Sequence, residues 1–307
     1  MDYIEGLVSV VIPTHNREKL VSRAVDSALN QTYRQIEVIV VSDGSTDNTD
    51  LIMAEYEKKF PNFRYISYKP GKGGNYARNT GVKAANGEYV AFLDDDDEWL
   101  ADKIEKQTGV FNSDPEIGIV CTAYTSVYDD SGKEKVFVPH APYDSSVEIL
   151  KNNQIGSTTT VCVRHELIDK VGMFDEDLCA KQDWDLWIRL CQITKVGVVK
   201  TPCVIYHNAT ENGQISWNYK KYADASEYLQ KKYYELRKKK LTKDEIRSVY
   251  LMDALGVARK AFKANNRKIV RKYAKLAFRY KPNSGSVVYV VASFLPSGLV
   301  RRFYKSN

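Results

Sequence analysis

Residues Tyr89-Val-Ala-Phe-Leu-Asp-Asp-Asp-Asp-Glu-Trp99 decide how the rest of the chain is interpreted. The apolar run from Tyr89 to Leu93 predicts a strand buried on both faces, as in parallel sheets. Four aspartates, Asp94 to Asp97, follow at its carboxyl end, where open α/β sheets place their ligands. Adjacent carboxylates repel one another unless a cation shares the site, and hard oxygen ligands favour magnesium or manganese over zinc. A solvated acidic loop that caps the next helix is the alternative, but the position after a buried strand favours a cation site.

Strands and helices alternate on the amino-terminal side of this stretch. Further apolar runs at 7–12, 36–41 and 64–68 predict strands, and helical spacing fills the segments between them. We expect Asn16 to be the N-cap of the first helix. The alternation predicts an α/β fold with a mostly parallel, Rossmann-type sheet and helices on both of its faces.

The middle of the chain has a different pattern. Residues 117–128 and 135–138 predict an antiparallel hairpin, and a helix near 146–152 is expected to precede a strand at 158–163. An amphipathic helix is predicted from Gln182 to Leu190. Two short strands, at 196–199 and 204–206, are expected to complete this part of the fold.

The carboxyl-terminal part is basic and helical. Residues 219–307 hold 23 Lys and Arg against 6 Asp and Glu, whereas residues 1–218 have a net charge of −11. Apolar and tyrosine side chains recur there at helical spacing, and Thr242-Lys-Asp-Glu245 is a capping box. The shift in charge and pattern predicts two domains, residues 1–217 and residues 218–307.

The composition is that of an ordinary globular protein, with 43% hydrophobic and 27% charged residues. The five cysteines are odd in number and form no CxxC pair, so we expect reduced, mostly buried thiols rather than disulfides or a zinc site. No basic stretch of a secretory signal opens the sequence, and no segment approaches the roughly 20 apolar residues of a membrane span. These features predict a cytoplasmic protein.

Five motifs occur in the order and spacing of a known family. They are Val8-Ser-Val-Val-Ile-Pro-Thr-His-Asn-Arg17, Ser42-Asp-Gly-Ser-Thr-Asp47, Ala77-Arg-Asn-Thr-Gly81, Phe92-Leu-Asp-Asp-Asp-Asp97 and Gly172-Met-Phe-Asp-Glu176. Together they resemble glycosyltransferase family 2 over roughly residues 7 to 215. The resemblance implies a GT-A fold and an enzyme that transfers a sugar from a nucleotide-sugar donor, usually with inversion at the anomeric carbon. Residues 1–217 would then be the catalytic domain and residues 218–307 a C-terminal helical extension.

The resemblance assigns several residues to the donor nucleotide. The turn after the first strand would lie against the base and ribose, and its residues are Pro13, Thr14, His15, Asn16 and Arg17. Asp43 would accept the ring N–H of the base, because a carboxylate makes a stronger hydrogen bond than a neutral oxygen. Arg78 would reach the base or the diphosphate, and its alternative is an arginine on a helix surface. Family habit favours a UDP-sugar, although guanine also offers a ring N–H.

The resemblance also implies a Mn²⁺ or Mg²⁺ cofactor at a DxD pair formed by Asp94 and Asp96. Asp96 would bind the cation that bridges both phosphates, and Asp94 or Asp95 would hold the ribose or a metal-bound water. The run of four aspartates leaves this register open by one residue. His207 lies where the family often places a histidine near the metal, so it is a candidate ligand as well as a candidate structural residue.

In the family, an aspartate before a tryptophan-rich helix acts as the catalytic base, and Asp183 aligns with it. Gln182 replaces the acid that usually precedes this aspartate. A base opposite the leaving group gives inversion and contributes about 10²–10⁴-fold to the rate. The alternative for Asp183 is a helix cap. Trp184 and Trp187 could stack on an acceptor sugar, although their spacing is more typical of a core.

The basic extension predicts an anionic partner. It carries no nucleic-acid fold signature, so we expect no nucleic acid. An anionic membrane surface fits its charge, and residues 287–304 could lie in the lipid interface. Because many relatives extend polyprenyl-linked glycans, a glycan or polyprenyl-linked glycan acceptor at the inner face of the cell membrane is our hypothesis. The alternatives are packing against the acidic domain or a homodimer through the C-terminal helices.

Two rival functions come from other classes. A sugar nucleotidyltransferase also pairs a parallel sheet with an aspartate-held metal, but it would carry a Gly-rich basic loop where this chain has Pro-Thr-His-Asn-Arg17. The other rival is a non-catalytic module that binds nucleotide sugar or acts as a scaffold. Turnover and donor binding by an Asp183→Asn variant separate these functions from a transferase.

Overall fold

The computed structural model describes residues 3–128, 132–208 and 218–294. The chain divides into two compact units. The first comprises Met1–Ile149, Asn153–Glu176 and Gln182–Glu211, and the second comprises Leu150–Asn152, Asp177–Lys181 and Asn212–Asn307. The domain boundary predicted after Trp217 falls at the end of residues 209–217, which are outside the described part of the chain.

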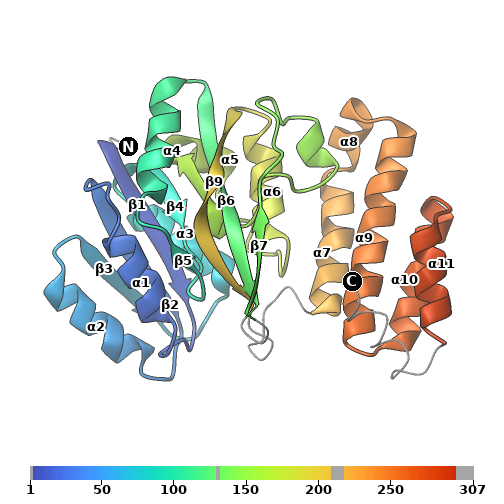
Figure 1. Ribbon diagram of the computed structural model, residues 1–307, viewed down its shortest axis with the longest axis horizontal. Helices are drawn as coiled ribbons and strands as arrows, with labels where there is room; N and C mark the ends of the chain where they lie inside the picture. Colours follow the sequence, from blue (N-terminus) through green and yellow to red (C-terminus); the bar gives the residue numbers. More distant parts are fainter. Residues whose placement is uncertain (1–2, 129–131, 209–217, 295–307) are drawn as a thin grey trace. The chain divides into compact units, whose positions relative to one another are not determined.

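The first unit is built on one sheet with the strand order β3-β2-β1-β4-β8-β6-β9-β5, and β7 pairs with β6 (Figure 1). The strands are β1 (Ile4–Thr14), β2 (Ile36–Asp43), β3 (Phe63–Tyr68), β4 (Gly87–Phe92), β5 (Glu98–Trp99), β6 (Ile117–Tyr128), β7 (Lys133–Phe137), β8 (Val161–Arg164) and β9 (Lys195–Asn208).

Strands β3, β2, β1 and β4 run parallel to one another. β8 is antiparallel to both β4 and β6, and β9 returns to a parallel pairing with β6. β2, β4 and the second half of β1 are almost wholly buried, which is why they appear as continuous apolar runs in the sequence, whereas the edge strand β3 is only partly buried. The predicted α/β class with a mostly parallel sheet is confirmed.

Helices cover both faces of this sheet, and Figure 1 shows α1 on the near face and α3 behind it. The helices of this unit are α1 (Val21–Leu29), α2 (Thr49–Lys59), α3 (Gly74–Ala84), α4 (Lys103–Ser113), α5 (His165–Val171) and α6 (Gln182–Leu190). One core cluster joins buried residues of α1, α2 and α4 to alternate residues of β1, β2 and β4. On the other face Gly81 of α3 touches β1 so closely that a Cβ there would lie 2.4 Å from Val11 Cγ1, and this contact requires glycine.

Three sequence-based expectations need correction. The helix predicted near 146–152 is a single 3₁₀ turn, Glu148–Leu150. The strand predicted at 158–163 begins as another 3₁₀ turn, Thr158–Thr160, and only β8 pairs with neighbours. The two short strands predicted at 196–199 and 204–206 are one strand, β9, which stays paired with β6 through register shifts.

The second unit is helical. Its helices are α7 (Tyr219–Lys232), α8 (Tyr234–Lys240), α9 (Lys243–Lys263), α10 (Arg267–Tyr280) and α11 (Ser284–Ala292). The predicted capping box is present at the start of α9, where Thr242 and Glu245 exchange side-chain and backbone hydrogen bonds. Inside this unit Lys181 pairs with Asp253 in a buried ion pair, and Leu251, Ala254 and Ala277 form a small core.

The cysteine prediction is confirmed, since all five thiols are free and only Cys179 is exposed. No helix in the described parts of the chain combines the length and the apolar character needed to cross a bilayer. The predicted interfacial segment at 287–304 is described only as far as Phe294, and its remainder lies outside the described residues.

Candidate active site

The carboxyl ends of β1, β2 and β4 meet at one edge of the sheet. The register pairs Thr14 with Ser42 near the ends of β1 and β2, and Phe92 at the end of β4 with Val11, so the segment after β4 begins alongside the last three residues of β1. The segments that follow these strands hold residues 15–17, 44–47 and 94–97. Parallel sheets bind ligands at this edge, and the candidate nucleotide-binding and metal-binding residues were predicted from the sequence to lie there.

The turn after β1 is fastened to the turn after β2. His15 Nδ1 lies 2.7 Å from the backbone oxygen of Asp43, and Asn16 Oδ1 accepts a 2.7 Å hydrogen bond from the backbone N–H of Thr46. Asn16 has φ 53°, a left-handed conformation that asparagine tolerates well. The predicted N-cap role of Asn16 is therefore wrong: α1 begins after Leu20, and Asn16 instead bridges the two turns.

Asp43 fixes a third loop to the same edge. Its carboxylate accepts backbone hydrogen bonds from Lys72 at 2.6 Å and from Gly73 at 2.8 Å, and the residue is 9% exposed. The chain can approach this closely because of Gly44, which has φ +73° and where a Cβ would lie 2.5 Å from the backbone nitrogen of Gly71. Each carboxylate oxygen retains lone pairs, so Asp43 can accept a further N–H from a ligand.

Arg78 is buried under the acidic run and is not a helix-surface residue. Its guanidinium donates a 2.6 Å hydrogen bond to Asp94 Oδ1, and its side chain is 9% exposed. The Phe174 ring lies 5.7 Å from the guanidinium carbon, a cation–π contact. Thr158 donates a 3.0 Å hydrogen bond to the other carboxylate oxygen of Asp94. Asp94 therefore has a fixed cation and a fixed hydroxyl as partners.

The next two aspartates have fewer partners. Asp95 lies 3.6 Å from Arg17 Nε, and burial together with the neighbouring charge of Asp96 raises the pKa of its carboxyl to about 7. Burial and the charge of Asp94 also raise the pKa of Asp96. Within the described residues no Lys, Arg or His nitrogen lies within 4 Å of the Asp96 carboxylate, and the charges of Arg17 and Arg23 act on it from farther away.

Asp97 and His207 form the inner end of the run. Asp97 is 1% exposed and accepts a 3.3 Å hydrogen bond from the backbone N–H of His207. Burial and the charges of Asp94 and Asp96 raise the pKa of Asp97 well above its ordinary value. The His207 ring nitrogen Nε2 lies 3.8 Å from Glu98 Oε2. The structure thus brings His207 beside the acidic run, and a metal-ligand role for it stays a prediction.

The donor set of this run fits Mg²⁺ or Mn²⁺ held by few protein ligands. Burial, and after it the charges of neighbouring aspartates, raises the pKa values of Asp95 and Asp96, and a divalent cation would favour their ionised forms. Over the described residues, no group of three or more His, Cys, Asp or Glu side chains is arranged as a metal cage. Magnesium is commonly bound by one or two carboxylates, with waters and substrate phosphates completing its shell. Asp96 and one neighbour would supply that number.

Asp183 opens α6 and lies within electrostatic reach of the acidic run. Burial, followed by the charge of Asp94, raises the pKa of Asp183 to about 6, while Arg78 and the Trp184 backbone lower it. Asn153 Nδ2 donates a 3.0 Å hydrogen bond to Asp183 Oδ2. In the same helix Asp185 is fully buried and pairs with Arg189, so these two aspartates of α6 have different surroundings.

The two tryptophans of α6 belong to the core. Trp184 is 7% exposed and donates to the backbone oxygen of Ile149, while Trp187 is fully buried and donates to that of Gly156. These contacts favour the core interpretation over stacking on a sugar. They also fix the helix that carries Asp183.

Asparagine side chains join two of the motifs seen in the sequence. Asn79 exchanges two 2.9 Å hydrogen bonds with the backbone of Phe174, and Asn75 donates to the backbone oxygen of Asp175. The Ala77–Gly81 and Gly172–Glu176 motifs thus meet beside Arg78. Two other contributors, Asn153 and Thr158, were not predicted, because each contacts an aspartate at least 30 residues away in the chain.

Comparison with known proteins bears on this arrangement. The profile of Glycosyl transferase family 2 matches residues 9–172, more than half of the chain. The chain belongs to glycosyltransferase family 2. This membership confirms the resemblance seen in the five motifs.

Relatives with curated names are glycosyltransferases. An uncharacterized glycosyltransferase of Rickettsia typhi is 35% identical over 196 residues, which cover 62% of this chain and 60% of the relative. The putative teichuronic acid biosynthesis glycosyltransferase TuaG of Bacillus subtilis is 33% identical, over 60% of this chain and 71% of TuaG. The UDP-Glc:alpha-D-GlcNAc-diphosphoundecaprenol beta-1,3-glucosyltransferase WfgD of Escherichia coli is 30% identical, over 69% of this chain and 80% of WfgD. The chain thus spans about 60% of the length of the Rickettsia relative.

Solved structures share the fold. S. aureus TarS 1-349 in complex with UDP-GlcNAc superposes with a TM-score of 0.61 at 18% identity, covering 94% of this family 2 chain and 90% of TarS 1-349. The mannosyltransferase PcManGT from Pyrobaculum calidifontis, in complex with GDP-Man and Mn²⁺, gives a TM-score of 0.60 at 19% identity, covering 98% of this chain and 88% of PcManGT. The GT-A-like fold expected from the resemblance is confirmed.

Proposed function

We propose that this family 2 chain is a metal-dependent, inverting glycosyltransferase. It transfers a sugar from a nucleotide-sugar donor to a hydroxyl of a glycan or a lipid-linked glycan. The observation that carries the proposal is the gathering of Asp43, Arg78 and the acidic run at one edge of a parallel sheet. Burial, and to a lesser extent the charge of Asp94, raises the pKa of the candidate base Asp183, which is consistent with a position near that run. A transfer from a nucleoside diphosphate needs both a base and a site for the diphosphate.

The donor nucleotide would lie along three loops: the turns after β1 and β2 and the loop that contains Lys72 and Gly73. The turn from Pro13 to Arg17 would contact base and ribose, and Asp43 would accept the ring N–H of the base. Asp94 and Asp95 would contact the ribose or a metal-bound water, and Arg78, already paired with Asp94, would hold that aspartate in place. Because Lys72 and Gly73 pin the Asp43 carboxylate, it is oriented before the base arrives.

The cofactor would be Mn²⁺ or Mg²⁺ at Asp96 with Asp94 or Asp95, and His207 is a further candidate ligand. When bound, the cation neutralises charge on the diphosphate as the sugar–phosphate bond breaks. A Mn²⁺ ion in the complex of the fold neighbour PcManGT supports this choice of metal.

Asp183 would act as the general base. At neutral pH a carboxyl with a pKa of about 6 is mostly ionised and is more basic than an ordinary aspartate. It would take the proton of the acceptor hydroxyl as that oxygen bonds to the anomeric carbon. The bond between this carbon and the phosphate oxygen breaks, its electrons leave with the nucleoside diphosphate, and the configuration is inverted. The hydrogen bond from Asn153 would keep one Asp183 oxygen oriented while the other faces the acceptor.

The names of the relatives support an acceptor in polysaccharide assembly. TuaG is named for teichuronic acid biosynthesis and WfgD for a diphosphoundecaprenol acceptor. We take a polyprenyl-linked glycan as the preferred acceptor, at the inner face of the cell membrane. A UDP-sugar is the preferred donor, since WfgD and one TarS complex carry UDP-sugars in their names.

The decisive experiment combines a donor screen with one variant. Thermal shift with Mn²⁺ across uridine, guanosine and thymidine sugars identifies the donor. Turnover of that donor by Asp183→Asn should fall about 10²–10⁴-fold, while its affinity for the donor is retained. Full turnover by the variant would contradict the base assignment. Donor binding without any turnover by the native chain, across a panel of lipid-linked acceptors, would favour a binding module.

A further inference from the structure

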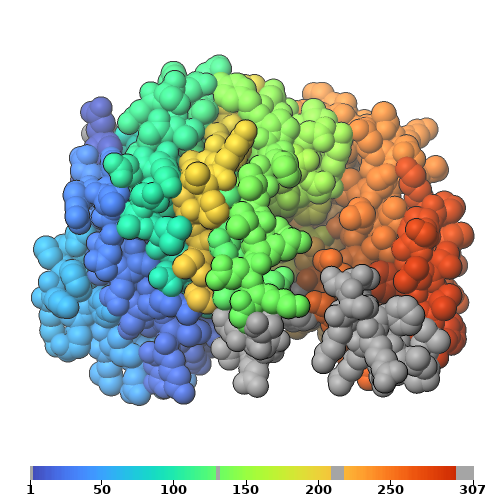
Figure 2. Space-filling view, in the orientation of Figure 1, coloured from blue at the N-terminus to red at the C-terminus, as the bar shows by residue number. Residues whose placement is uncertain are grey.

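An exposed apolar surface lies on the last helical hairpin of the second unit. Val288 of α11 is 61% exposed, Val291 is 55% exposed, and Phe294 just beyond the helix is 67% exposed. Phe278 of α10 is 45% exposed. Figure 2 shows the atoms of α10 and α11, coloured orange-red to red, at the surface of this unit. Large apolar side chains gathered in this way mark an interaction site more often than isolated ones do.

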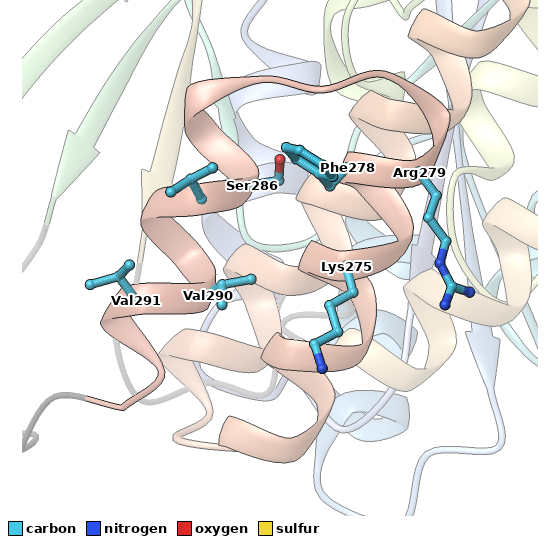
Figure 3. Close-up of a pocket in the computed structure, with 7 residues that line it drawn as sticks. Lys275, Phe278, Arg279, Ser286, Val290 and Val291 are labelled. Carbon is cyan, nitrogen blue, oxygen red and sulfur yellow. The ribbon is translucent and has the colours of Figure 1, made fainter.

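The two helices line an open pocket of about 310 Å³ (Figure 3). Lys275, Phe278 and Arg279 line it from α10, and Val287, Val290 and Val291 line it from α11. Figure 3 shows Phe278 beside Ser286 across the two helices, with the charged ends of Lys275 and Arg279 extending from α10. Apolar side chains of both helices therefore line the pocket, and Lys275 and Arg279 of α10 give it a basic rim.

The basic rim belongs to a longer run of positive charge. Residues 267–281 hold seven Lys and Arg and no Asp or Glu. Within the described residues, neither Lys275 nor Arg279 forms an ion pair, whereas Lys281 pairs with Asp244. Arg271 lies over the Phe294 ring at 4.9 Å, so basic and apolar groups interleave on this surface. Such a surface suits a partner that is both anionic and apolar.

Charge and shape decide among three kinds of partner. Nucleic acid would match the basic residues but would leave the valines of α11 against a polar backbone. A symmetric contact with a second copy would set the same seven positive charges against each other. The interface of an anionic bilayer offers phosphates for the lysine and arginine side chains and acyl chains for the valines and phenylalanines.

We propose that α10 and α11 dock this chain on anionic phospholipid bilayers, with lipid phosphates at Lys275 and Arg279 and acyl chains against Val287, Val291 and Phe294. The proposal is independent of sugar transfer, because it concerns binding to a lipid surface in the absence of donor. It would bring this chain to the surface where lipid-linked acceptors reside.

The test is flotation of the full chain with two kinds of vesicle, one of phosphatidylcholine alone and one with about a third phosphatidylglycerol. Neither contains a polyprenyl lipid, so binding reports on the bilayer itself. We expect binding to the anionic vesicles only, weakened by raised salt. Lys275→Gln and Arg279→Gln should each lower the partition coefficient about five-fold, and the double variant about 25-fold, since each basic residue near an anionic surface contributes independently.

Two matched control variants test whether a loss of vesicle binding is specific to α10 and α11, or whether any change in surface charge or at an exposed apolar residue causes it. Lys239→Gln removes one exposed charge from α8, and Leu51→Glu places a carboxylate at a residue of α2 that is 69% exposed. Each should change binding less than two-fold, whereas Val291→Glu should lower it at least ten-fold. Circular dichroism melting shows that each variant is folded, and turnover with a water-soluble acceptor should be unchanged.

Equal binding to neutral vesicles, or equal losses for Lys239→Gln and Lys275→Gln, would overturn the proposal. It would also be overturned if Val291→Glu converted a dimer to a monomer and left flotation unchanged, because the surface would then join two copies. Failure of sugar transfer with flotation intact would count against the proposed function and leave this surface standing.

Discussion

Arg78 donates a 2.6 Å hydrogen bond to Asp94 and gives the first aspartate of the acidic run a buried positive partner. Asp96, two residues further on, has no such partner within 4 Å among the described residues. The run is therefore electrostatically uneven. Asp94 has a direct ion pair, whereas the charges of Arg17 and Arg23 act on Asp96 only from beyond 4 Å. A divalent cation bound with the substrate would supply the close positive charge that Asp96 lacks. This asymmetry favours Asp96 over Asp94 as the principal metal ligand.

The Arg78–Asp94 pair should be worth measuring by a double-mutant cycle. Arg78→Gln leaves the Asp94 carboxylate without its cation and should lower the free energy of unfolding by about 1–3 kcal/mol. Asp94→Asn should cost a similar amount, and the double variant should cost less than the sum of the two. Lys58→Gln, which breaks an exposed pair with Glu55, is the matched control and should cost under about 1 kcal/mol. Additive losses in the cycle would show that the pair does not act as a unit.

The rate of transfer should depend on the ionisation of Asp183. Its pKa is about 6, and only the ionised carboxylate can take a proton. The value of kcat/KM should therefore be flat above about pH 7 and fall about ten-fold per pH unit below the pKa. The pKa of Asp95, about 7, lies in the same range, so protonation of Asp95 could also weaken metal binding as the pH falls. Assays at saturating Mn²⁺ keep the cation bound and separate this effect from the titration of Asp183. A profile that stays flat down to pH 5 would rule out this group as the base.

The ionised form of Asp183 should lower the free energy of unfolding at neutral pH, where this form would act as the base. Its folded-state pKa is raised above the ordinary value, so the folded chain binds its proton more tightly than the unfolded chain does. The contribution to stability is present below about pH 4 and is lost as the pH rises through 6. Asp183→Asn should therefore melt at a higher temperature than the native chain at pH 7.5, and the difference should shrink at pH 4. A lower melting temperature at pH 7.5 would mean that the carboxylate stabilises α6 as a cap.

Asn153 is a positioning residue for Asp183. Its side chain donates to Asp183 Oδ2 and accepts backbone hydrogen bonds from Ile155 and Gly156, so it holds both the loop and the carboxylate. Asn153→Ala removes a donor to the ionised form, which should raise the pKa of Asp183 and move the acidic limb of the pH profile upward. We expect kcat to fall about ten-fold, on the scale of a misoriented catalytic group, with KM for the donor unchanged.

Asn153→Ser offers the contrasting variant, because a hydroxyl can still donate to the carboxylate. It should restore part of the activity and return the acidic limb toward its native position. An acidic limb that does not move in either variant would limit Asn153 to a structural role in its loop.

The strand–helix order of residues 7–93 was predictable because both faces of β1, β2 and β4 are largely covered. Burial on two faces makes a continuous apolar run, and glycine or proline marks its end. β9 was harder. Thr201-Pro202 interrupts its apolar pattern, and the strand continues only because β6 accommodates the break with shifts in register. The 3₁₀ turns at 148–150 and 158–160 involve too few residues for a periodic signal to separate them from a helix or a strand.

Some residues of the candidate site were likewise predictable from the sequence, whereas others were not. Asp43, Arg78 and the acidic run follow strand ends or lie in motifs, so their gathering at one edge was predicted from topology. Asn16 fits an N-cap by residue type, but its side chain is engaged by the backbone of Thr46, 30 residues away. Thr158 donates to Asp94, 64 residues away, and a threonine at the start of a run of β-branched residues is typical of a strand in the sequence. Only the folded chain shows such long-range contacts.

The central claim is that the acidic run at the edge of the sheet holds a divalent cation, which in turn holds the diphosphate of the donor. The most direct test is a crystal of the full chain soaked with UDP and Mn²⁺, examined for anomalous scattering from manganese. We predict one manganese peak beside the Asp96 carboxylate, bridging to the diphosphate, with the base near Asp43. A manganese ion bound elsewhere, or a nucleotide bound away from Asp96, would contradict the account.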